Sequence, residues 1–267
     1  MSLFDESGRV LVSPSRLKLW MECPLKWKAV YVDEVRTAPT PALVFGSAIH
    51  KALELHHRSL WMGGRASTEE LEQAFRLAVD EGCRPEGFDP ISVDQDEFLG
   101  QARKLIELYV GRFGDEPVAA AELVLSAPLV DGTGEDLGAQ LTGIIDLVTA
   151  DRRVIDLKSS ARASDLFDVT VAHSVQLDAY RWLMLHSTGQ EPKALVIRTL
   201  LRRKNPDVVL PMWVIRRMDT VLEPTKKQML ETKKLLDAAG TPRADRKYRH
   251  PWGPSRERPE VTHPLGT

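Results

Sequence analysis

The 267-residue chain contains only 2 cysteines and no long apolar run. Cys23 and Cys83 cannot build a disulfide scaffold, and alone they cannot fill a four-cysteine zinc or iron–sulfur site. No stretch approaches the ~20 apolar residues of a membrane span, and the opening MSLFDESGRV lacks the basic start and apolar stretch of a signal peptide. We therefore expect a soluble, cytoplasmic protein with no membrane partner.

The charge is nearly balanced overall but unevenly distributed along the chain. The formal net charge is -2, yet residues 193–258 contain 17 Lys and Arg against 7 Asp and Glu, which leaves +10 in this segment and -12 in the remainder. A basic segment and an acidic remainder suit a protein that binds phosphates with one surface and a metal ion with another. A solvated face on a C-terminal helix would explain the same composition.

Hydrophobic periodicity predicts an α/β domain in which helices flank a three-stranded meander. Strands are expected at 119–130, 139–149, 153–159 and 194–201, with 208–215 able to pair with the last. Helices are expected between Ser13 and Pro24 and at 43–62, 67–82, 93–113, 171–187 and 219–239. We interpret residues 1–267 as a single domain with a helical insertion at about 65–114 and a basic extension at about 219–267.

The segment VIDLKSS places two charged side chains in an apolar strand. Asp156 and Lys158 are two residues apart, so they point to the same face of the strand. Their apolar neighbours indicate burial, and a buried charge is costly unless it is paired or bound to a metal ion. Taken alone, the pattern is explained by a local ion pair at a strand end.

Asp146 changes this interpretation because it ends the apolar run LTGIID on the preceding strand. Only a tight turn separates the two strands, so Asp146 and Asp156 can face each other, and hard cations prefer such pairs of oxygen ligands. His50 is a third candidate ligand, since the small residues at 46–48 would let its helix approach the sheet closely. We interpret the other histidines of interest as ordinary capping or solvent-facing residues: His56, His57 and His173.

In this order the motifs resemble the PD-(D/E)XK nuclease superfamily, and within it the RecB-like exonuclease family. SPSRLKLWMECPLKWKAVY is similar to the family's N-terminal S-x-S-x-L…CP…Y signature, and GSAIHKALE to the helix that supplies a metal-binding histidine. LTGIIDLV and VIDLKSS resemble the catalytic aspartate and D-x-K strands, and QLDAY resembles the Q-x-x-x-Y element. The resemblance covers about residues 13–201 and implies a restriction-endonuclease-like αβββαβ core with a mixed central sheet and added helices.

The resemblance also implies hydrolysis of phosphodiester bonds with Mg²⁺ or Mn²⁺ as the cofactor. Position by position, the metal ligands become His50, Asp146, Asp156 and the carbonyl of Leu157. The catalytic residues become Asp146, Asp156, Lys158, Gln176 and Tyr180. Among these, Lys158 orients or activates water, and Gln176 with Tyr180 supports the site and the substrate. Glu122 matches a glutamate often found on the first strand and is expected to have a supporting role.

One part of the pattern departs from many relatives, including helicase-linked and CRISPR-associated exonucleases. Those proteins pair the cysteine before the proline with three cysteines near the C-terminus to hold a [4Fe-4S] cluster. Here Cys23 is present, but the tail from Lys247 contains no cysteine, and Cys83 falls in the helical insertion. We therefore expect no iron–sulfur cluster and interpret Cys23 as a small buried packing residue.

The sequence predicts a DNA nuclease, specifically an exonuclease that prefers single strands. Its expected setting is DNA repair, recombination, or phage or defence processing in a prokaryote or an infected host, with a helicase or recombination partner. Arg202, Arg203 and Lys204 are candidate phosphate contacts that would position DNA without reading its sequence. The alternatives are a structure-selective endonuclease and a non-catalytic DNA-binding subunit of a repair or defence complex.

The helical insertion bears on whether the nuclease acts as an exonuclease or as an endonuclease. If the helices at 67–113 cover the strand ends at Asp146 and Asp156, a single strand must be threaded to reach the metal, and duplex is excluded by its width. If these helices pack to one side, they leave an open groove instead.

Overall fold

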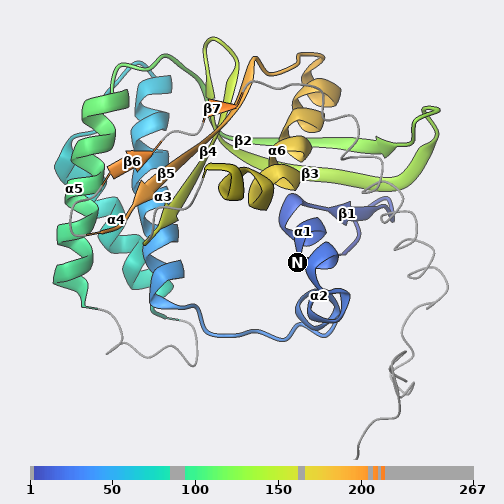
Figure 1. Cartoon of the computed structure of the whole chain (residues 1–267), viewed down its shortest axis with the longest axis horizontal. Coiled ribbons are helices and arrows are strands. Elements are labelled where there is room, and N and C mark those ends of the chain that lie inside the picture. The colour runs from blue at the N-terminus through green and yellow to red at the C-terminus, as the bar shows by residue number, and fades with distance from the viewer. Residues whose placement is uncertain (1–2, 85–93, 162–165, 204–206, 210–211, 214–267) are drawn as a thin grey trace, which may run out of the picture. The chain divides into compact units, whose positions relative to one another are not determined.

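The computed structural model describes residues 3–84, 94–161, 166–203, 207–209 and 212–213 (Figure 1). Its helices are α1 (Pro14–Glu22), α2 (Pro24–Tyr31), α3 (Pro41–Trp61), α4 (Thr68–Gly82), α5 (Gln95–Phe113) and α6 (Leu166–Thr188). Its strands are β1 (Val10–Val12), β2 (Val118–Val130), β3 (Asp136–Thr149), β4 (Arg153–Ser160), β5 (Ala194–Leu201), β6 (Asp207–Val209) and β7 (Met212–Trp213). The basic extension predicted at 219–267, with its helix, lies outside the described residues.

The strands of the described chain form one mixed sheet in the order β1-β3-β4-β5-β6, to which β2 is added beside β3 and β7 beside β5. The pairs β2–β3 and β3–β4 are antiparallel, whereas β4–β5 and β1–β3 are parallel. A parallel pair needs a long crossover, and α6 provides it between β4 and β5. The elements α3, β2, β3, β4, α6 and β5 follow one another as the predicted αβββαβ core, so the predicted fold class is confirmed.

The first two helices begin at residues whose side chains cap them. Ser13 accepts a hydrogen bond from the backbone N–H of Arg16 at the start of α1, as predicted. Cys23 does the same for α2, because its Sγ accepts from the Lys26 N–H at 3.5 Å. The side chain of Cys23 is only partly buried. The interpretation of Cys23 as a buried packing residue is therefore wrong, since its thiol serves as a helix cap.

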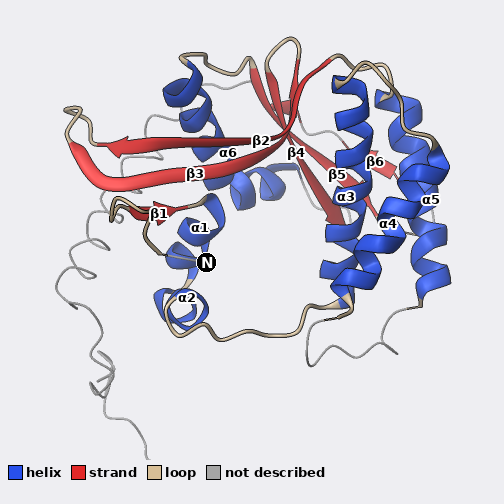
Figure 2. Cartoon of the chain, turned by 180° about the vertical axis from the view of Figure 1, so that it is seen from behind, coloured by secondary structure: helices blue, strands red, loops and turns tan. Residues whose placement is uncertain are grey.

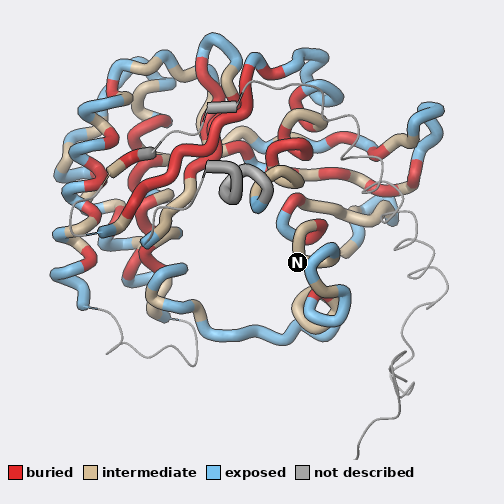
Figure 3. Tube along the Cα trace, viewed as in Figure 1, coloured by how far each residue is buried: buried red, intermediate tan, exposed pale blue. Residues whose placement is uncertain are grey.

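The insertion formed by α4 and α5 packs alongside α3 on one face of the sheet (Figures 1 and 2). α4 begins at the predicted capping box, in which Ser67 and Glu70 each bond the other's backbone. Side chains from all three helices share one buried core with Ile155 and Leu157 of β4 (Figure 3). Because these two residues point to that face, Asp156 between them points to the other. Of the two arrangements considered for the insertion, it therefore has the one in which it packs to one side and does not cover Asp156.

Two glycines let helices approach the strands closely. A Cβ atom at Gly46 of α3 would lie 2.7 Å from Ser159 Oγ of β4, and one at Gly143 of β3 would lie 2.8 Å from Leu183 Cδ1 of α6. A side chain at either position would collide with a neighbour that is already in place. The prediction that small residues let the helix of His50 approach the sheet is confirmed at Gly46.

The remaining differences concern short strands. The sequence did not indicate β1, which pairs with β3 from Val10↔Ala139 to Val12↔Leu141. Three residues are too few to show a period, so hydrophobic alternation could not reveal this strand. The strand predicted at 208–215 is present as β6 and β7, which both pair with β5. Among the described helices, none has the length and apolar character needed to span a membrane.

Candidate active site

The first site residues lie where β3 and β4 separate. The two strands pair over residues 147–148 and 154–155, and continuing this register would bring Asp146 opposite Asp156. Instead of a further backbone pair, Asp146 Oδ2 accepts a hydrogen bond from the Leu157 N–H at 2.7 Å. The carboxylate thus occupies the place where the strands diverge, and a backbone donor of β4 fixes its position.

Asp156 is the centre of a chain of polar contacts between β4 and α6. It is 1% exposed. Lys158 Nζ and Gln176 Nε2 both donate to Asp156 Oδ1 at 2.9 Å, and Gln176 Nε2 also donates to Tyr180 Oη at 2.8 Å. Asp156 Oδ2 lies 2.7 Å from Lys158 Nζ as an ion pair, but it receives no hydrogen bond of suitable geometry. One oxygen of this buried carboxylate therefore retains unused acceptor capacity.

His50 reaches the same site from α3. Its Nδ1 atom lies 3.9 Å from Asp146 Oδ2, which is too far for a hydrogen bond but within the span of two metal–ligand bonds of about 2.1 Å each. Burial, and then the charge of Lys158, lowers the pKa of His50 to about 4. The imidazole is therefore neutral at physiological pH, which is the form that binds metal ions.

Burial disfavours the charged form of both Asp146 and Asp156. Burial raises the pKa of Asp156 to about 6; the charge of Lys158 opposes this rise and that of Asp146 adds to it. Burial also raises the pKa of Asp146, against the effect of its hydrogen bond from Leu157. A divalent cation between these carboxylates would compensate both the loss of hydration and their mutual repulsion.

Glu122 adds a third acidic group on β2. It lies opposite Asp146 in the β2–β3 register, between two paired positions on either side. Its backbone has a φ of 50°, which is uncommon for any residue but glycine and is found where position is functionally constrained. Burial raises the pKa of Glu122 to about 7, and the charges of Asp146 and Glu54 add to the rise. The predicted supporting residue is thus brought beside Asp146.

The types of side chain at this site suit a divalent cation, although their arrangement does not surround one. Within the described part of the chain, no three His, Cys, Asp or Glu side chains stand together in a metal-binding arrangement. The carboxylate of Asp156 is turned to Lys158. Its unbonded Oδ2 is a buried acceptor that a cation would satisfy. Together with Asp146, neutral His50 and the carbonyl of Leu157, it forms a nitrogen and oxygen donor set suited to Mg²⁺ or Mn²⁺.

His173 belongs to this neighbourhood, and the interpretation of it as an ordinary solvent-facing histidine is wrong. Burial lowers its pKa to about 4, and the charges of Lys158 and Lys18 act in the same direction. It also hydrogen-bonds Gln176. The spacing of His173, Gln176 and Tyr180, by three and then four residues, places all three on one face of α6. That spacing is the sequence signal that could have revealed it.

The residues after β5 that were predicted to contact phosphate lie in different surroundings. Arg202 is stacked on the aromatic core, with its Cζ 4.8 Å from the Phe45 ring centroid. Arg203 is exposed, and its Nη2 lies 3.6 Å from Asp207 Oδ2. Lys204 lies outside the described residues. No sequence pattern indicated the stacking of Arg202, and a phosphate contact by these residues stays a prediction.

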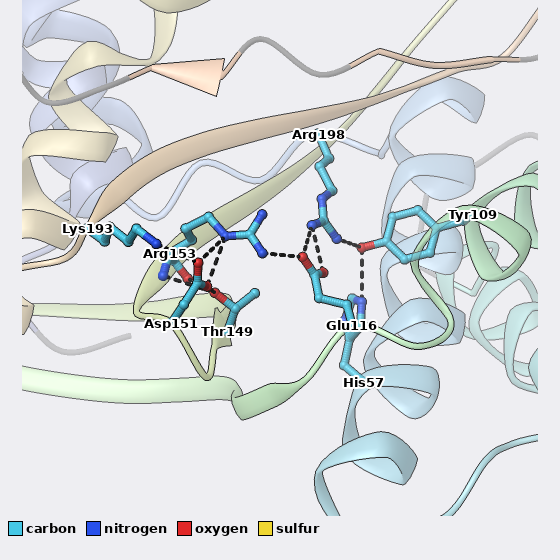
Figure 4. Close-up of polar contacts among 8 residues, drawn as sticks. All are labelled: His57, Tyr109, Glu116, Thr149, Asp151, Arg153, Lys193 and Arg198. Carbon is cyan, nitrogen blue, oxygen red and sulfur yellow. Dashed lines mark hydrogen bonds and ion pairs between the residues drawn. The ribbon is translucent and has the colours of Figure 1, made fainter.

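A second buried polar network ties α3 and α5 to the sheet (Figure 4). Tyr109 Oη lies 3.0 Å from His57 Nε2 and accepts a hydrogen bond from Arg198 Nη1 at 2.8 Å. Arg198 Nη2 donates to both carboxylate oxygens of Glu116 at 2.7 Å. His57 and its neighbour His56 are each 2% exposed. The interpretation of these two histidines as capping or solvent-facing residues is therefore wrong.

This network links the helix of one candidate ligand to the strand of another. His57 follows His50 by seven residues on α3, and Arg198 is the register partner of Leu157, which follows Asp156 on β4. The hydrogen bonds between His57, Tyr109 and Arg198 therefore hold α3 and the central strands in a fixed relation.

Comparisons with known proteins agree with this architecture. A model of the PD-(D/E)XK nuclease superfamily matches residues 11–250, whereas no curated protein matches the sequence. The solved structure of a protein from Eubacterium rectale, provisionally described as an exonuclease, is 16% identical and has a TM-score of 0.60 over 90% of each chain. A second structure, of SSO0001, is 13% identical over 82% of this chain and 85% of that one, with a TM-score of 0.35, too low to indicate a shared fold. Because the family model spans most of its length, the chain belongs to the PD-(D/E)XK nuclease superfamily.

Proposed function

We propose that this chain is a metal-dependent DNA nuclease that degrades single-stranded DNA from an end. The observation that carries the proposal is the convergence of Asp146 and Asp156 where β3 and β4 diverge, with His50 and Lys158 beside them. Two carboxylates and a neutral imidazole are ligands for a divalent cation, and the superfamily typically uses such metals.

The chain's own groups account for the binding of that cation. His50, Asp146, Asp156 and the carbonyl of Leu157 would hold it. When bound, such a cation lowers the pKa of water and neutralises charge on phosphate oxygens. Glu122, whose raised pKa reflects burial beside Asp146, stands close enough to influence the charge of the site.

Lys158 supplies a positive charge that the protein itself positions. Its Nζ is held by Asp156 at the edge of the buried site, with the side chain 26% exposed. From there it can stabilise the negative charge that builds on a phosphate during attack, or orient the attacking water. Gln176 and Tyr180 keep Asp156 in place through their chain of hydrogen bonds.

The choice of DNA and of an exonuclease mode has separate support. The superfamily implies a nucleic acid substrate, and the Eubacterium rectale protein with the same fold is provisionally described as an exonuclease. The +10 segment at 193–258 suits a phosphate backbone read without sequence preference. A repair, recombination or defence role, with a helicase or recombination partner, belongs to the same proposal.

A subunit that only binds DNA is the weaker reading of this site. Buried carboxylates repel a phosphate backbone, so binding alone gives no chemical reason to keep Asp146 and Asp156 together. A structure-selective endonuclease uses the same chemistry, and the comparison of open with closed substrates distinguishes it.

The test is digestion of single- and double-stranded DNA labelled at the 5′ or 3′ end, with Mg²⁺ or Mn²⁺. We expect the wild type to shorten single strands progressively from one end, and the Asp156→Ala variant and an EDTA control to leave them intact. Intact DNA with both metals and the wild-type protein would contradict the proposal.

A further inference from the structure

Two aliphatic side chains are exposed on the sheet close to the candidate active site. Val124 of β2 and Ile144 of β3 are register partners, and they are 66% and 50% exposed. Ile144 precedes Asp146 by two residues on the same strand, so the two side chains point to one face, about 7 Å apart along the strand. Two adjacent exposed aliphatic side chains beside the candidate site offer a small apolar surface to a ligand.

The exposed face continues outward from this pair along the β2–β3 ribbon. Alternate residues of both strands remain accessible there, whereas the residues between them are more deeply buried. The buried face packs against α6, where Gly143 meets Leu183 and Tyr180. Figures 1 and 2, which view the ribbon from opposite sides, show α6 on one side and no other labelled helix over the opposite face.

Between residues 124 and 128 of β2 and residues 140 and 144 of β3, this face carries no charge. Its three register pairs are Val124↔Ile144, Ser126↔Thr142 and Pro128↔Gln140. We name these six residues the ribbon strip. The ribbon strip is uncharged and lies beside acidic Asp146, in a chain with 28% charged residues. Val124, Ser126, Pro128 and Ile144 are exposed, and Gln140 and Thr142 are partly exposed. The strip offers an aliphatic surface next to the site, and hydroxyl and amide groups further out, with Gln140 Nε2 donating to Ser126 Oγ at 2.7 Å.

From this geometry we infer that the ribbon strip binds the bases of the single-stranded DNA whose backbone is cleaved at Asp146. The inference rests on the proposed function and adds a base-binding surface to it. A strand with a phosphate at Asp146 continues over the adjoining surface, and the strip has no cation to pair with further phosphates. The bases, which have apolar faces and polar edges, are the part of the strand that matches the strip. The contact is independent of sequence, because every base has an apolar face.

The test compares a fluorescently labelled oligothymidylate with a matched strand in which tetrahydrofuran residues replace the nucleosides. Both are titrated in EDTA, so that binding is measured without hydrolysis. We expect the wild type to bind the oligothymidylate roughly fivefold to tenfold more tightly, as the burial of a few apolar groups would give. The Val124→Ser/Ile144→Ser double variant loses this preference and binds both strands equally. The Leu77→Ser/Leu108→Ser control, which removes two exposed aliphatic side chains from α4 and α5, keeps it.

Each outcome decides between the inference and its rivals. Equal binding of the two strands by the wild type, or an unchanged preference in the double variant, overturns the inference even if the wild type hydrolyses DNA. A base preference that the double variant loses supports the inference even if no hydrolysis is found, in which case the proposed function alone fails. If light scattering shows that the wild type is a dimer and the double variant a monomer, the strip joins two copies of the chain and the inference is wrong.

Discussion

Asp146 and Leu157 are joined by a hydrogen bond from the Leu157 N–H to the Asp146 carboxylate, at 2.7 Å, across the point where β3 and β4 separate. A backbone donor that would otherwise serve a neighbouring strand instead holds a catalytic candidate. The position of Asp146 relative to Asp156 is therefore set by the backbone of β4, with little freedom left to the side chain. The β3–β4 ladder thus ends at the two candidate ligands.

The first prediction concerns the three central side chains. Replacing Asp146, Asp156 or Lys158 by alanine should each abolish hydrolysis, because losing a metal ligand or the adjacent charge removes several kcal/mol of transition-state stabilisation, on the order of a thousandfold or more in rate. The fold of the two aspartate variants should survive, since removing a buried carboxylate of raised pKa also removes an unfavourable charge. The fold of Lys158→Ala should survive because the raised pKa of Asp156 lets that carboxyl group take up a proton once its partner is gone. Single-turnover cleavage and thermal melting measure the two effects. Cleavage by Asp156→Ala at the wild-type rate would refute the site assignment.

The second prediction concerns the close approach of α3 to β4. In Gly46→Ala, the new Cβ would meet Ser159 Oγ at 2.7 Å and displace the helix that carries His50, at a cost of about 1–3 kcal/mol. Cleavage should fall with stability, as measured by rate and by urea unfolding. The double variant Gly46→Ala/Ser159→Ala should recover both, because the Cβ of residue 159 lies 4.0 Å away. Gly111→Ala on α5, where nothing lies within 4 Å of the new atom, is the control and should be neutral or stabilising.

The order and type of the main helices and strands could be predicted because the hydrophobic residues of each recur with a clear period. The β-branched run at 194–201 coincides with β5, and the capping box at Ser67 marks the start of α4. β1 could not be found, since its three residues gain their strand geometry only by pairing with β3. The side of the sheet on which the insertion packs is likewise a tertiary property, set by the core that α4 and α5 share with β4.

For the site, the sequence indicated the residue types but not their contacts. The pattern D-x-K predicts that Asp156 and Lys158 share a face, and they form the expected ion pair. The hydrogen bond from Leu157 to Asp146 depends on where two strands diverge, which no periodicity encodes. The burial of His57 against Tyr109 depends on the packing of α5 on α3, so a histidine of unremarkable spacing could not be distinguished from a solvent-facing one.

The third prediction is a loss of stability in acid that depends on His57. Burial lowers the pKa of His57 to about 3 in the folded protein, against an ordinary value of 6.5. Below about pH 6.5, His57 therefore binds a proton in the unfolded chain but not in the folded chain. This contribution to stability is complete above that pH and is lost progressively down to about pH 3, by ~1.4 kcal/mol per pH unit.

Urea unfolding of the wild type and of His57→Gln across this pH range measures the effect. Above pH 6.5 the two proteins should differ by a constant amount, the cost of altering the contact with Tyr109. Below that pH, the free energy of unfolding of the variant should fall less steeply as the pH is lowered. The difference in slope should correspond to the uptake of one proton on unfolding. Parallel stability curves at all pH values would show that His57 does not titrate as inferred.

The fourth prediction concerns iron. The purified protein should be colourless and free of bound iron, including after anaerobic purification, because the sequence lacks the further cysteines of a cluster. Cys23→Ser should change stability by less than ~1 kcal/mol, since serine is also a good cap for α2. Metal analysis and thermal melting check the two statements. Stoichiometric iron, or unfolding of the variant with loss of colour, would show that Cys23 is a cluster ligand.

The fifth prediction is that cleavage requires a free DNA end. Because α4 and α5 lie on the face of β4 opposite Asp156, they cannot supply the roof that would force threading. The connection at 32–40, which is exposed and without helix or strand, spans from α2 to α3 (Figures 1 and 2). α1 packs on α6 and α3 on β4, so the site elements on both sides are joined by this connection.

We expect the substrate strand to pass between the connection at 32–40 and the sheet, in which case its terminus must be threaded to reach Asp156. Linear single-stranded DNA should therefore be degraded, while a covalently closed single-stranded circle persists under the same conditions. Both binding and degradation should weaken steeply with salt, as expected when phosphate contacts dominate. Gel analysis of the two substrates over a salt series gives the answer, with a circle linearised by a single cut as the control for sequence. If circle and linear strand disappear at equal rates, the end requirement is wrong and the endonuclease alternative explains the same catalytic residues.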